Sequence, residues 1–187
     1  MLKYPLVLID TEYTADENSQ RTSWRGQHRE IIQVGLLALD EKLTVLDSLR
    51  AYVRPKLNPV LSEYIKKLTG IRQTDVNGAP ELPEAWKKMA GYCQNRNLYS
   101  FGDDKRVFEE NFTIHGMSVP TDVVRMHIIR SFLKERCAAF GIRDFERYTS
   151  GTLCQAFGKK GKPAHDALND MNNLRLVLLE LRSRGLL

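Results

Sequence analysis

The fold is decided near the start of the chain, where residues 6–12 read LVLIDTE. Four apolar residues followed by polar ones are typical of a short buried strand that ends at a functional site. Asp10 and Glu12 lie two positions apart, so on a strand their side chains leave the same face, while Thr11 points the other way. Two carboxylates on one face can share a divalent cation, although the pattern also fits the plain polar end of a strand.

The elements that follow this strand predict an α/β protein. Residues 31–39 and 44–53 read as two more strands that form a hairpin across 40–42. Strands then alternate with helices; the predicted strands are 98–101 and 123–126, and the predicted helices are 59–70, 82–95, 104–115, 129–140, 146–157 and 164–184. Three strands before the first alternation favour a central mixed five-stranded sheet flanked by helices over a fully parallel one.

Size and composition limit the possible classes of protein. A chain of 187 residues, of which 42% are hydrophobic, is expected to form a single domain over 1–187 with one core. Its longest apolar stretches are too short to cross a bilayer and no signal-like segment begins it, so we expect a soluble protein without a membrane partner. Cys93, Cys137 and Cys154 lack the CxxC spacing, which favours free thiols in a reducing cytoplasm.

The charge balance favours an anionic partner. The net charge is +5 and the isoelectric point is near 9.1. Lysine and arginine side chains that neutralise phosphates release condensed counterions, which favours nucleic acid as the partner. An ordinary solvated surface explains the same excess equally well, so charge alone decides nothing.

A second group of polar residues lies near the end of the chain, where residues 165–170 read HDALND. His165 at the entrance of a helix and Asp170 in its second turn can reach one pocket. The aspartate could then hold a metal ion while the histidine takes a proton from water. His165 could also be a cap or a surface residue, with Asp166 as its partner.

A third group, SFGDD at residues 100–104, follows a predicted strand and begins a helix. Gly102 would let the backbone approach a ligand. Either Asp103 or Asp104 could cap the helix while the other faces the site.

These three groups together resemble the three motifs of the DEDDh family of 3'-to-5' exonucleases, in the same order and at plausible separations. The resemblance covers nearly the whole chain, and segments 30–35, 53–55 and 68–71 look like the branch that trims RNA 3' ends. It implies an RNase H-like fold, with the acidic residues presented by a central mixed sheet.

The resemblance also implies roles for five residues. Asp10, Glu12, Asp104 and Asp170 would bind two Mg²⁺ or Mn²⁺ ions, and His165 would be the general base. His165 suits that role because an unperturbed histidine is neutral near pH 7. The reaction would hydrolyse the terminal phosphodiester of single-stranded RNA or DNA and release nucleoside 5'-monophosphates.

The middle motif departs from the family pattern. Relatives near this branch usually carry the aspartate three residues after the glycine, whereas Gly102 is followed directly by two aspartates. We expect Asp104 to be the ligand because the apolar Phe108 follows it by four positions. Asp103 and Val107 satisfy the same spacing, so this alternative stays open.

The substrate contacts are inferred from the same resemblance. The predicted substrate-binding residues are Tyr13, Thr14, Leu68, Thr69, Ile71 and Lys162. Leu68 and Ile71 fit ordinary packing equally well. Lys162 belongs with Lys159 and Lys160 to a loop predicted to contact phosphates, although exposed lysines are usually just solvated. Residues 14–27 are predicted to form a long polar loop at the substrate entrance.

Three other functions compete with this reading. An RNase H-like endonuclease is disfavoured by the HxxxxD ending, and a silent nucleic-acid-binding module by the presence of every expected carboxylate. A polymerase proofreading exonuclease is disfavoured because only Leu186 and Leu187 follow Gly185. We therefore expect a freestanding exonuclease, either monomeric or homodimeric, that acts on a nucleic-acid 3' end.

Overall fold

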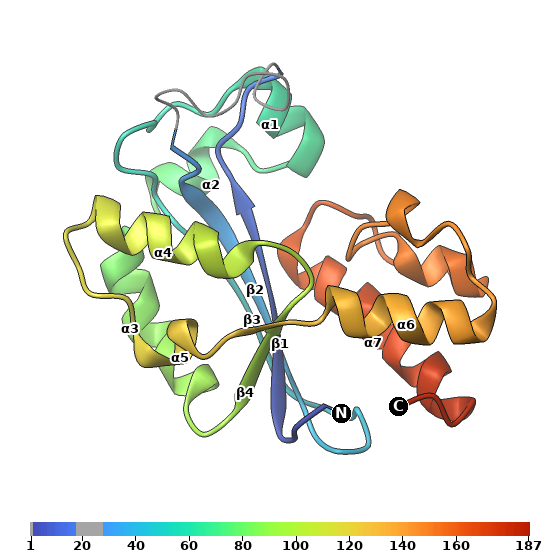
Figure 1. Ribbon diagram of the computed structural model, residues 1–187. Coiled ribbons are helices and arrows are strands. Elements are labelled where there is room, and N and C mark those ends of the chain that lie inside the picture. Colours follow the sequence, from blue (N-terminus) through green and yellow to red (C-terminus); the bar gives the residue numbers. More distant parts are fainter. Residues whose placement is uncertain (1, 18–27) are drawn as a thin grey trace.

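The computed structural model describes residues 2–17 and 28–187, and its centre is a mixed five-stranded sheet (Figure 1). The strands are β1 (Leu6–Tyr13), β2 (Ile31–Leu39), β3 (Val45–Tyr52), β4 (Asn97–Ser100) and β5 (His127–Ile128), in the order β3-β2-β1-β4-β5. β2 runs antiparallel to both β1 and β3, whereas β4 is parallel to β1 and to β5. The predicted mixed sheet is therefore confirmed.

Helices cover both faces of this sheet (Figure 1). They are α1 (Glu63–Thr69), α2 (Gln73–Asn77), α3 (Leu82–Cys93), α4 (Asp104–Ile114), α5 (Thr121–Val124), α6 (Arg130–Phe140) and α7 (Ala167–Ser183), with two 3₁₀ turns, η1 (Phe145–Arg147) and η2 (Leu153–Phe157). Among the described residues, no helix is long and apolar enough to cross a membrane.

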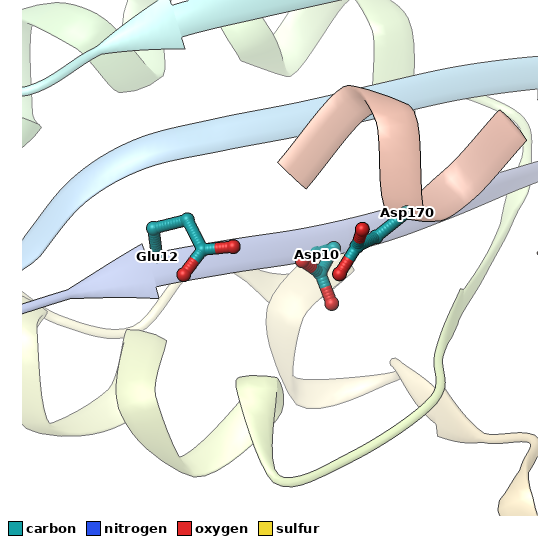
Figure 2. Close-up of side chains that lie close together, drawn as sticks. All are labelled: Asp10, Glu12 and Asp170. Carbon is teal, nitrogen blue, oxygen red and sulfur yellow. The ribbon is translucent and has the colours of Figure 1, made fainter. Parts of the chain in front are cut away.

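The alternation of side chains along β1 divides the core into two layers. Leu6 and Leu8 pack into a cluster with residues of α6 and α7. Val7 and Ile9 point to the opposite face and pack with residues of α3 and α4. Since side chains alternate along a strand, Asp10 lies on the same face as Leu6 and Leu8, the face that α7 covers. Asp170 of α7 lies on that face too (Figure 2).

The first helix begins later than the sequence predicts. The prediction starts it at 59, but the side chain of Ser62 accepts a hydrogen bond from the Ile65 amide and caps α1 there. Gly70 ends the helix as predicted, with a φ of 73°. The short helix α2, which the sequence pattern does not predict, follows directly.

Two predicted elements are wrong. Residues 123–126 do not form a strand: the first two belong to α5, and the edge strand is the two-residue β5 beyond. A short apolar run cannot distinguish a strand from one helical turn. Residues 146–157 form two 3₁₀ turns separated by a bend at 148–151 rather than one helix. The bend brings Ser150 and Gly151 against α7, as described below.

Candidate active site

Three carboxylates meet where the start of α7 crosses β1. Figure 2 shows Asp10 and Glu12 on β1 and Asp170 on α7, with their carboxylates turned toward one another. Ligand oxygens of all three lie within 4.8 Å of one another, and all three residues are buried. The prediction that Asp10 and Glu12 leave the same face of a strand is confirmed.

The close approach of α7 to the sheet depends on Gly35, the residue of β2 that pairs with Asp10. A Cβ atom at Gly35 would lie 2.3 Å from the backbone of Ala167 and Leu168. The first turn of α7 therefore rests on the sheet beside Asp10, which brings Asp170 to the other two carboxylates.

Gln33, two residues before Gly35 on β2, forms hydrogen bonds with the N-terminal end of α7. Its Oε1 accepts a hydrogen bond from the Ala167 amide at 2.8 Å, and its Nε2 donates to Asp166 at 3.4 Å. The first amides of a helix have no partner within the helix, so this contact satisfies one of them. The sequence analysis missed Gln33, although it lies in the family-like segment 30–35.

Ser150 and Gly151, in the bend before η2, contact the side chain of Asp170. A Cβ atom at Gly151 would lie 2.3 Å from Asp170 Oδ1, so any side chain there would displace the carboxylate or the bend. The neighbouring Ser150 hydroxyl donates to Asp10 at 3.4 Å and to Asp170 Oδ2 at 3.5 Å. Asp170 Oδ1 itself is buried and has no hydrogen-bond partner among the described residues. An unpartnered carboxylate oxygen beside two other carboxylates suits a cation.

Asp104 reaches the cluster from the other face of β1. It is the first residue of α4, and its Oδ1 accepts hydrogen bonds from the Thr11 amide at 3.0 Å and the Thr11 hydroxyl at 2.7 Å. The pairing of β1 with β4 ends at Ile9, so Asp104 satisfies an amide just beyond that pairing. The Asp104 side chain is buried.

Asp103, the alternative middle ligand, points away from the cluster. Its side chain is 56% exposed, and its Oδ2 lies 3.4 Å from Nη1 of Arg29. It occupies the N-cap position of α4 without a side-chain capping bond. The geometry thus supports Asp104 as the fourth carboxylate.

Burial and mutual repulsion raise the pKa values of all four carboxyl groups. Burial raises the pKa of Glu12 to about 8 and that of Asp170 to about 7, with the neighbouring carboxylates adding to both shifts. Burial, followed by the charge of Asp104, raises the pKa of Asp10 well above its usual range. The pKa of Asp104 is also raised, because burial outweighs the hydrogen bonds from Thr11.

These shifts show that four negative charges cannot coexist here near neutral pH without compensation. Hard divalent cations prefer carboxylate oxygen, and these residues supply only that type of ligand. Asp10, Glu12 and Asp170, with the unpartnered Oδ1 of Asp170 among them, therefore fit a divalent metal ion, and Asp104 lies close enough to raise the pKa of Asp10.

The cluster opens into a cleft of about 220 Å³, which we call the acidic cleft; its lining includes Asp10, Tyr13, Arg29, Asp104, Arg130 and Ser150. Arg29 holds Glu110 in a bidentate pair, with distances of 3.1 and 2.7 Å. Arg130 lies over the Phe101 ring at 5.0 Å and pairs with Glu146 at 2.6 Å. Two cationic groups thus lie at the rim of a site whose centre is acidic.

His165 lies just before α7, half-buried. Its φ of 63° places it in the left-handed region, which is uncommon for a residue with a side chain. Its backbone N–H donates to Asp170 and opposes the rise of that pKa. The turn therefore fixes His165 directly beside the acidic cluster.

Asp166, the alternative partner for His165, contacts other residues. Asp166 caps α7 through the Asn169 amide at 2.9 Å and pairs with Arg50 at 2.8 Å. The helix begins at Ala167, three residues later than predicted, so Asp170 lies in its first turn rather than its second. Negative charge is favourable in the first turn of a helix.

The predicted substrate residues fall into two groups. Tyr13 lines the acidic cleft, and Thr14 borders a separate hollow of about 180 Å³ with His28 and Ser62. Lys162 is exposed, and Asn173 binds its backbone amide and carbonyl at 2.8 and 2.9 Å. Residues 18–27 of the predicted entrance loop lie outside the described residues.

The second group lies at the end of α1. Ile71 is 2% exposed and packs in a cluster with Ile32 and Ile65, which Leu68 also contacts. Thr69 donates to the Ile65 carbonyl at 2.8 Å. Ile71 thus packs in the core, and the substrate contacts of Leu68, Thr69 and Ile71 stay predictions.

Glu30 is a further residue that the sequence analysis did not single out. Its buried carboxylate accepts hydrogen bonds from the amides of Lys56, Leu57 and Asn58 at 2.5 to 2.9 Å. The bond pattern holds the 56–58 turn against the start of β2, beside the hollow that Thr14 borders.

The chain is similar in sequence to known exonucleases. The family model described as Exonuclease (RNase_T) matches residues 7–178. The 3'-5' exonuclease eri1 of Schizosaccharomyces pombe is 41% identical over 90 residues, which cover 47% of this chain and 28% of that protein. The 3'-5' exoribonuclease 1 of Rattus norvegicus is 32% identical over 94 residues, which cover 50% and 26%. Each match thus covers little more than a quarter of the relative's own length.

A solved structure shares the fold over almost the whole chain. The nuclease domain of 3'hExo, described as a DEDDh family member bound to rAMP, aligns with a TM-score of 0.80 and 22% identity. The alignment covers 96% of this chain and 92% of that one. The likeness supports the RNase H-like arrangement of strands and helices described above.

Proposed function

The chain belongs to the DEDDh exonuclease family of the RNase H-like superfamily, and we propose that it removes nucleotides one at a time from the 3' end of single-stranded RNA. The observation that carries the proposal is the buried meeting of Asp10, Glu12 and Asp170, with Asp104 beside them. Burial and mutual repulsion disfavour the ionised form of these carboxyl groups, and bound cations would offset both effects.

We propose that the four carboxylates hold two Mg²⁺ or Mn²⁺ ions. Two such cations would stabilise the attacking and the leaving oxygen of a displacement at phosphorus. Glu12 and Asp170 come from different elements, so the cluster can contact ions from several directions. Asp10 lies between them and Asp104 and would be shared.

His165 would accept the proton of the attacking water. A neutral imidazole is a suitable acceptor near pH 7, and the backbone contact with Asp170 fixes the residue beside the cluster. Water would attack the terminal phosphorus, and the bond to the 3'-oxygen of the preceding nucleotide would break. The products would be a nucleoside 5'-monophosphate and a strand with a new 3'-hydroxyl.

RNA is favoured over DNA as the substrate on the evidence of relatives. One matching protein is named an exoribonuclease, and the solved nuclease domain was bound to rAMP. Tyr13 lines the acidic cleft, where it could contact the terminal nucleotide, and Thr14, Leu68, Thr69 and Lys162 are the other proposed contacts. A reducing cytoplasm remains the proposed location, in keeping with three buried free cysteines.

The test is degradation of matched 5'-labelled single-stranded RNA and DNA oligonucleotides with Mg²⁺, Mn²⁺ or EDTA. We expect a ladder that shortens from the 3' end with either metal, faster with RNA, and no cleavage in EDTA. Intact substrate under all conditions would refute the exonuclease and favour a binding module. Internal cleavage products would favour an endonuclease.

A further inference from the structure

A third hollow, larger than the acidic cleft and the hollow beside Thr14, lies along the edge of the sheet. It has a volume of about 700 Å³ and lies where the C-terminal end of α3, the start of β4 and α5 meet. Its charged residues are Lys3, Arg96, Lys105, Asp122 and Arg125, and we call it the basic groove. Four cationic side chains thus accompany one carboxylate.

The cations of the basic groove differ from most others on the surface. Arg54, Lys66, Lys87, Arg106 and Lys134 all form ion pairs with carboxylates. Within residues 2–17 and 28–187, none of the four groove cations does so. Lys105 Nζ donates to the Val124 carbonyl at 2.6 Å and Arg96 Nη1 to the Tyr92 carbonyl at 2.7 Å. These bonds orient the two cations and leave their charges uncompensated.

The basic groove and the acidic cleft share no lining residue, but consecutive residues of the chain line them. Lys105 directly follows Asp104 in the first turn of α4. The strand β4 runs from Arg96 and Asn97 in the groove to the segment of Phe101 and Gly102 that lines the cleft. At about 3.3 Å per residue, its four residues span about 13 Å, the length of a few nucleotides at most.

We propose that the basic groove binds the phosphate backbone of the strand whose 3' end lies in the acidic cleft. The inference rests on the exonuclease function proposed above. Lysine and arginine side chains neutralise phosphates, and the amides of Gln94, Asn95 and Asn97 in the same lining suit sugar and phosphate oxygens. The continuity with the cleft favours nucleic acid over an acidic peptide.

The recognition should not depend on sequence. Apart from His127, which stacks on Tyr99 at 5.2 Å, the described lining offers no ring on which a base could stack. Contacts to phosphate and sugar set position without reading bases. The groove would therefore retain a long substrate between successive cleavages.

The test compares a groove variant with a control of equal charge. Arg96→Glu/Arg125→Glu reverses two groove charges, and Lys88→Glu/Arg143→Glu reverses two exposed charges outside both hollows. The substrates are a dinucleotide, too short to reach the groove from the cleft, and an RNA of about 20 nucleotides with the same 3' end. If the Arg96 variant does not fold by circular dichroism, Lys3→Glu/Arg125→Glu replaces it, since both of its residues are exposed.

We expect the groove variant to lower kcat/KM for the long RNA by about tenfold and for the dinucleotide by less than about twofold, with a shallower salt dependence for the long RNA. The control should lose little on either substrate. Equal losses on both RNAs, or equal losses in variant and control, would overturn the proposal.

A binding measurement in EDTA separates this proposal from the exonuclease itself. Fluorescence anisotropy of the labelled long RNA should show weaker binding by the groove variant even if the chain cleaves nothing. Cleavage by the wild type with unchanged RNA binding by the variant would overturn the groove alone. Groove-dependent binding of poly-glutamate, with RNA binding unchanged, would identify an acidic peptide as the ligand and also overturn it.

Discussion

The acidic cleft and the basic groove each gather charges mainly of one sign, but the carboxylates of the cleft are buried, whereas Lys3 and Arg125 of the groove are exposed. In the cleft, burial raises the pKa values of four carboxyl groups, so the cluster destabilises the fold unless a cation binds. In the groove, Lys3 and Arg125 are exposed, and water screens their repulsion.

The difference indicates what each region can do. A buried cluster of carboxylates fixes a small cation at defined oxygen atoms, which chemistry at one phosphorus requires. An open set of cations exerts a diffuse attraction, which suits a flexible chain of phosphates. Asp104 of the cleft and Lys105 of the groove are consecutive residues, so one strand could meet both.

Neutralising the centre of the acidic cleft should have the largest effect. Asp10→Asn removes a charged oxygen that borders the other three carboxylates, and we expect RNA cleavage to fall by at least about 10³-fold. Since the change also removes buried repulsion, the metal-free variant should melt no lower than the wild type at pH 8. Cleavage rates and thermal unfolding measure the two effects. Retained cleavage would refute the metal assignment.

The two neighbouring aspartates at the start of α4 should differ widely. Asp104→Ala should lower cleavage by about 100-fold or more, because its carboxylate is buried in the cluster and also holds Thr11. Asp103→Ala loses only an exposed contact with Arg29 and should cost less than about threefold. Single-turnover rates with saturating Mn²⁺ provide the comparison. Similar losses in both variants would mean that the middle motif is misassigned.

A methyl group beside Asp170 should have a smaller effect than removal of a ligand. In Gly151→Ala, the new Cβ would lie 2.3 Å from Asp170 Oδ1, so the carboxylate or the bend must move. We expect cleavage to fall by about 10- to 100-fold. Gly91→Ala is the matched control, since nothing lies within 4 Å of a Cβ there. A partial rescue by higher metal concentration would show that metal affinity is what Gly151 protects.

The sequence predicted the parts of this site that depend on local pattern. The alternation along residues 6–12 placed Asp10 and Glu12 on one face, and the strand–Gly–Asp–helix order placed Asp104 at a helix start. Both follow from the periodicity of a single element. The family resemblance then connected these motifs with His165 and Asp170, which no periodicity could do.

The residues that shape the site were missed because their roles exist only in three dimensions. Gly35 matters because a helix that begins 132 residues later rests on it. Ser150 and Gly151 lay in a predicted helix, because the apolar residues around them are spaced as in one. Their actual bend is selected by contact with Asp10 and Asp170, which a local pattern does not contain.

The smallest effect concerns the dependence of stability on pH, to which the cleft should contribute and the groove should not. Burial raises the pKa of Glu12 from 4.5 to about 8, so between these values the folded chain keeps a proton that the unfolded chain has lost. Stability of the metal-free chain should therefore fall as pH rises through that window, by about 5 °C in melting temperature or more. Added Mg²⁺ or Mn²⁺ should remove much of this slope.

Two substitutions turn that slope into a comparison of the regions. Glu12→Gln removes the titrating group, so its metal-free melting temperature should decline less between pH 5 and 8 than that of the wild type. Arg125→Gln removes an exposed charge of the basic groove and should run parallel to the wild type, within about 1 °C. If the melting temperature of Glu12→Gln declined with pH as steeply as that of the wild type, ionisation of Glu12 would not destabilise the fold. The contrast between buried and exposed charges would then be wrong. A changed slope for Arg125→Gln would mean that the two regions are coupled through the β4–α4 connection.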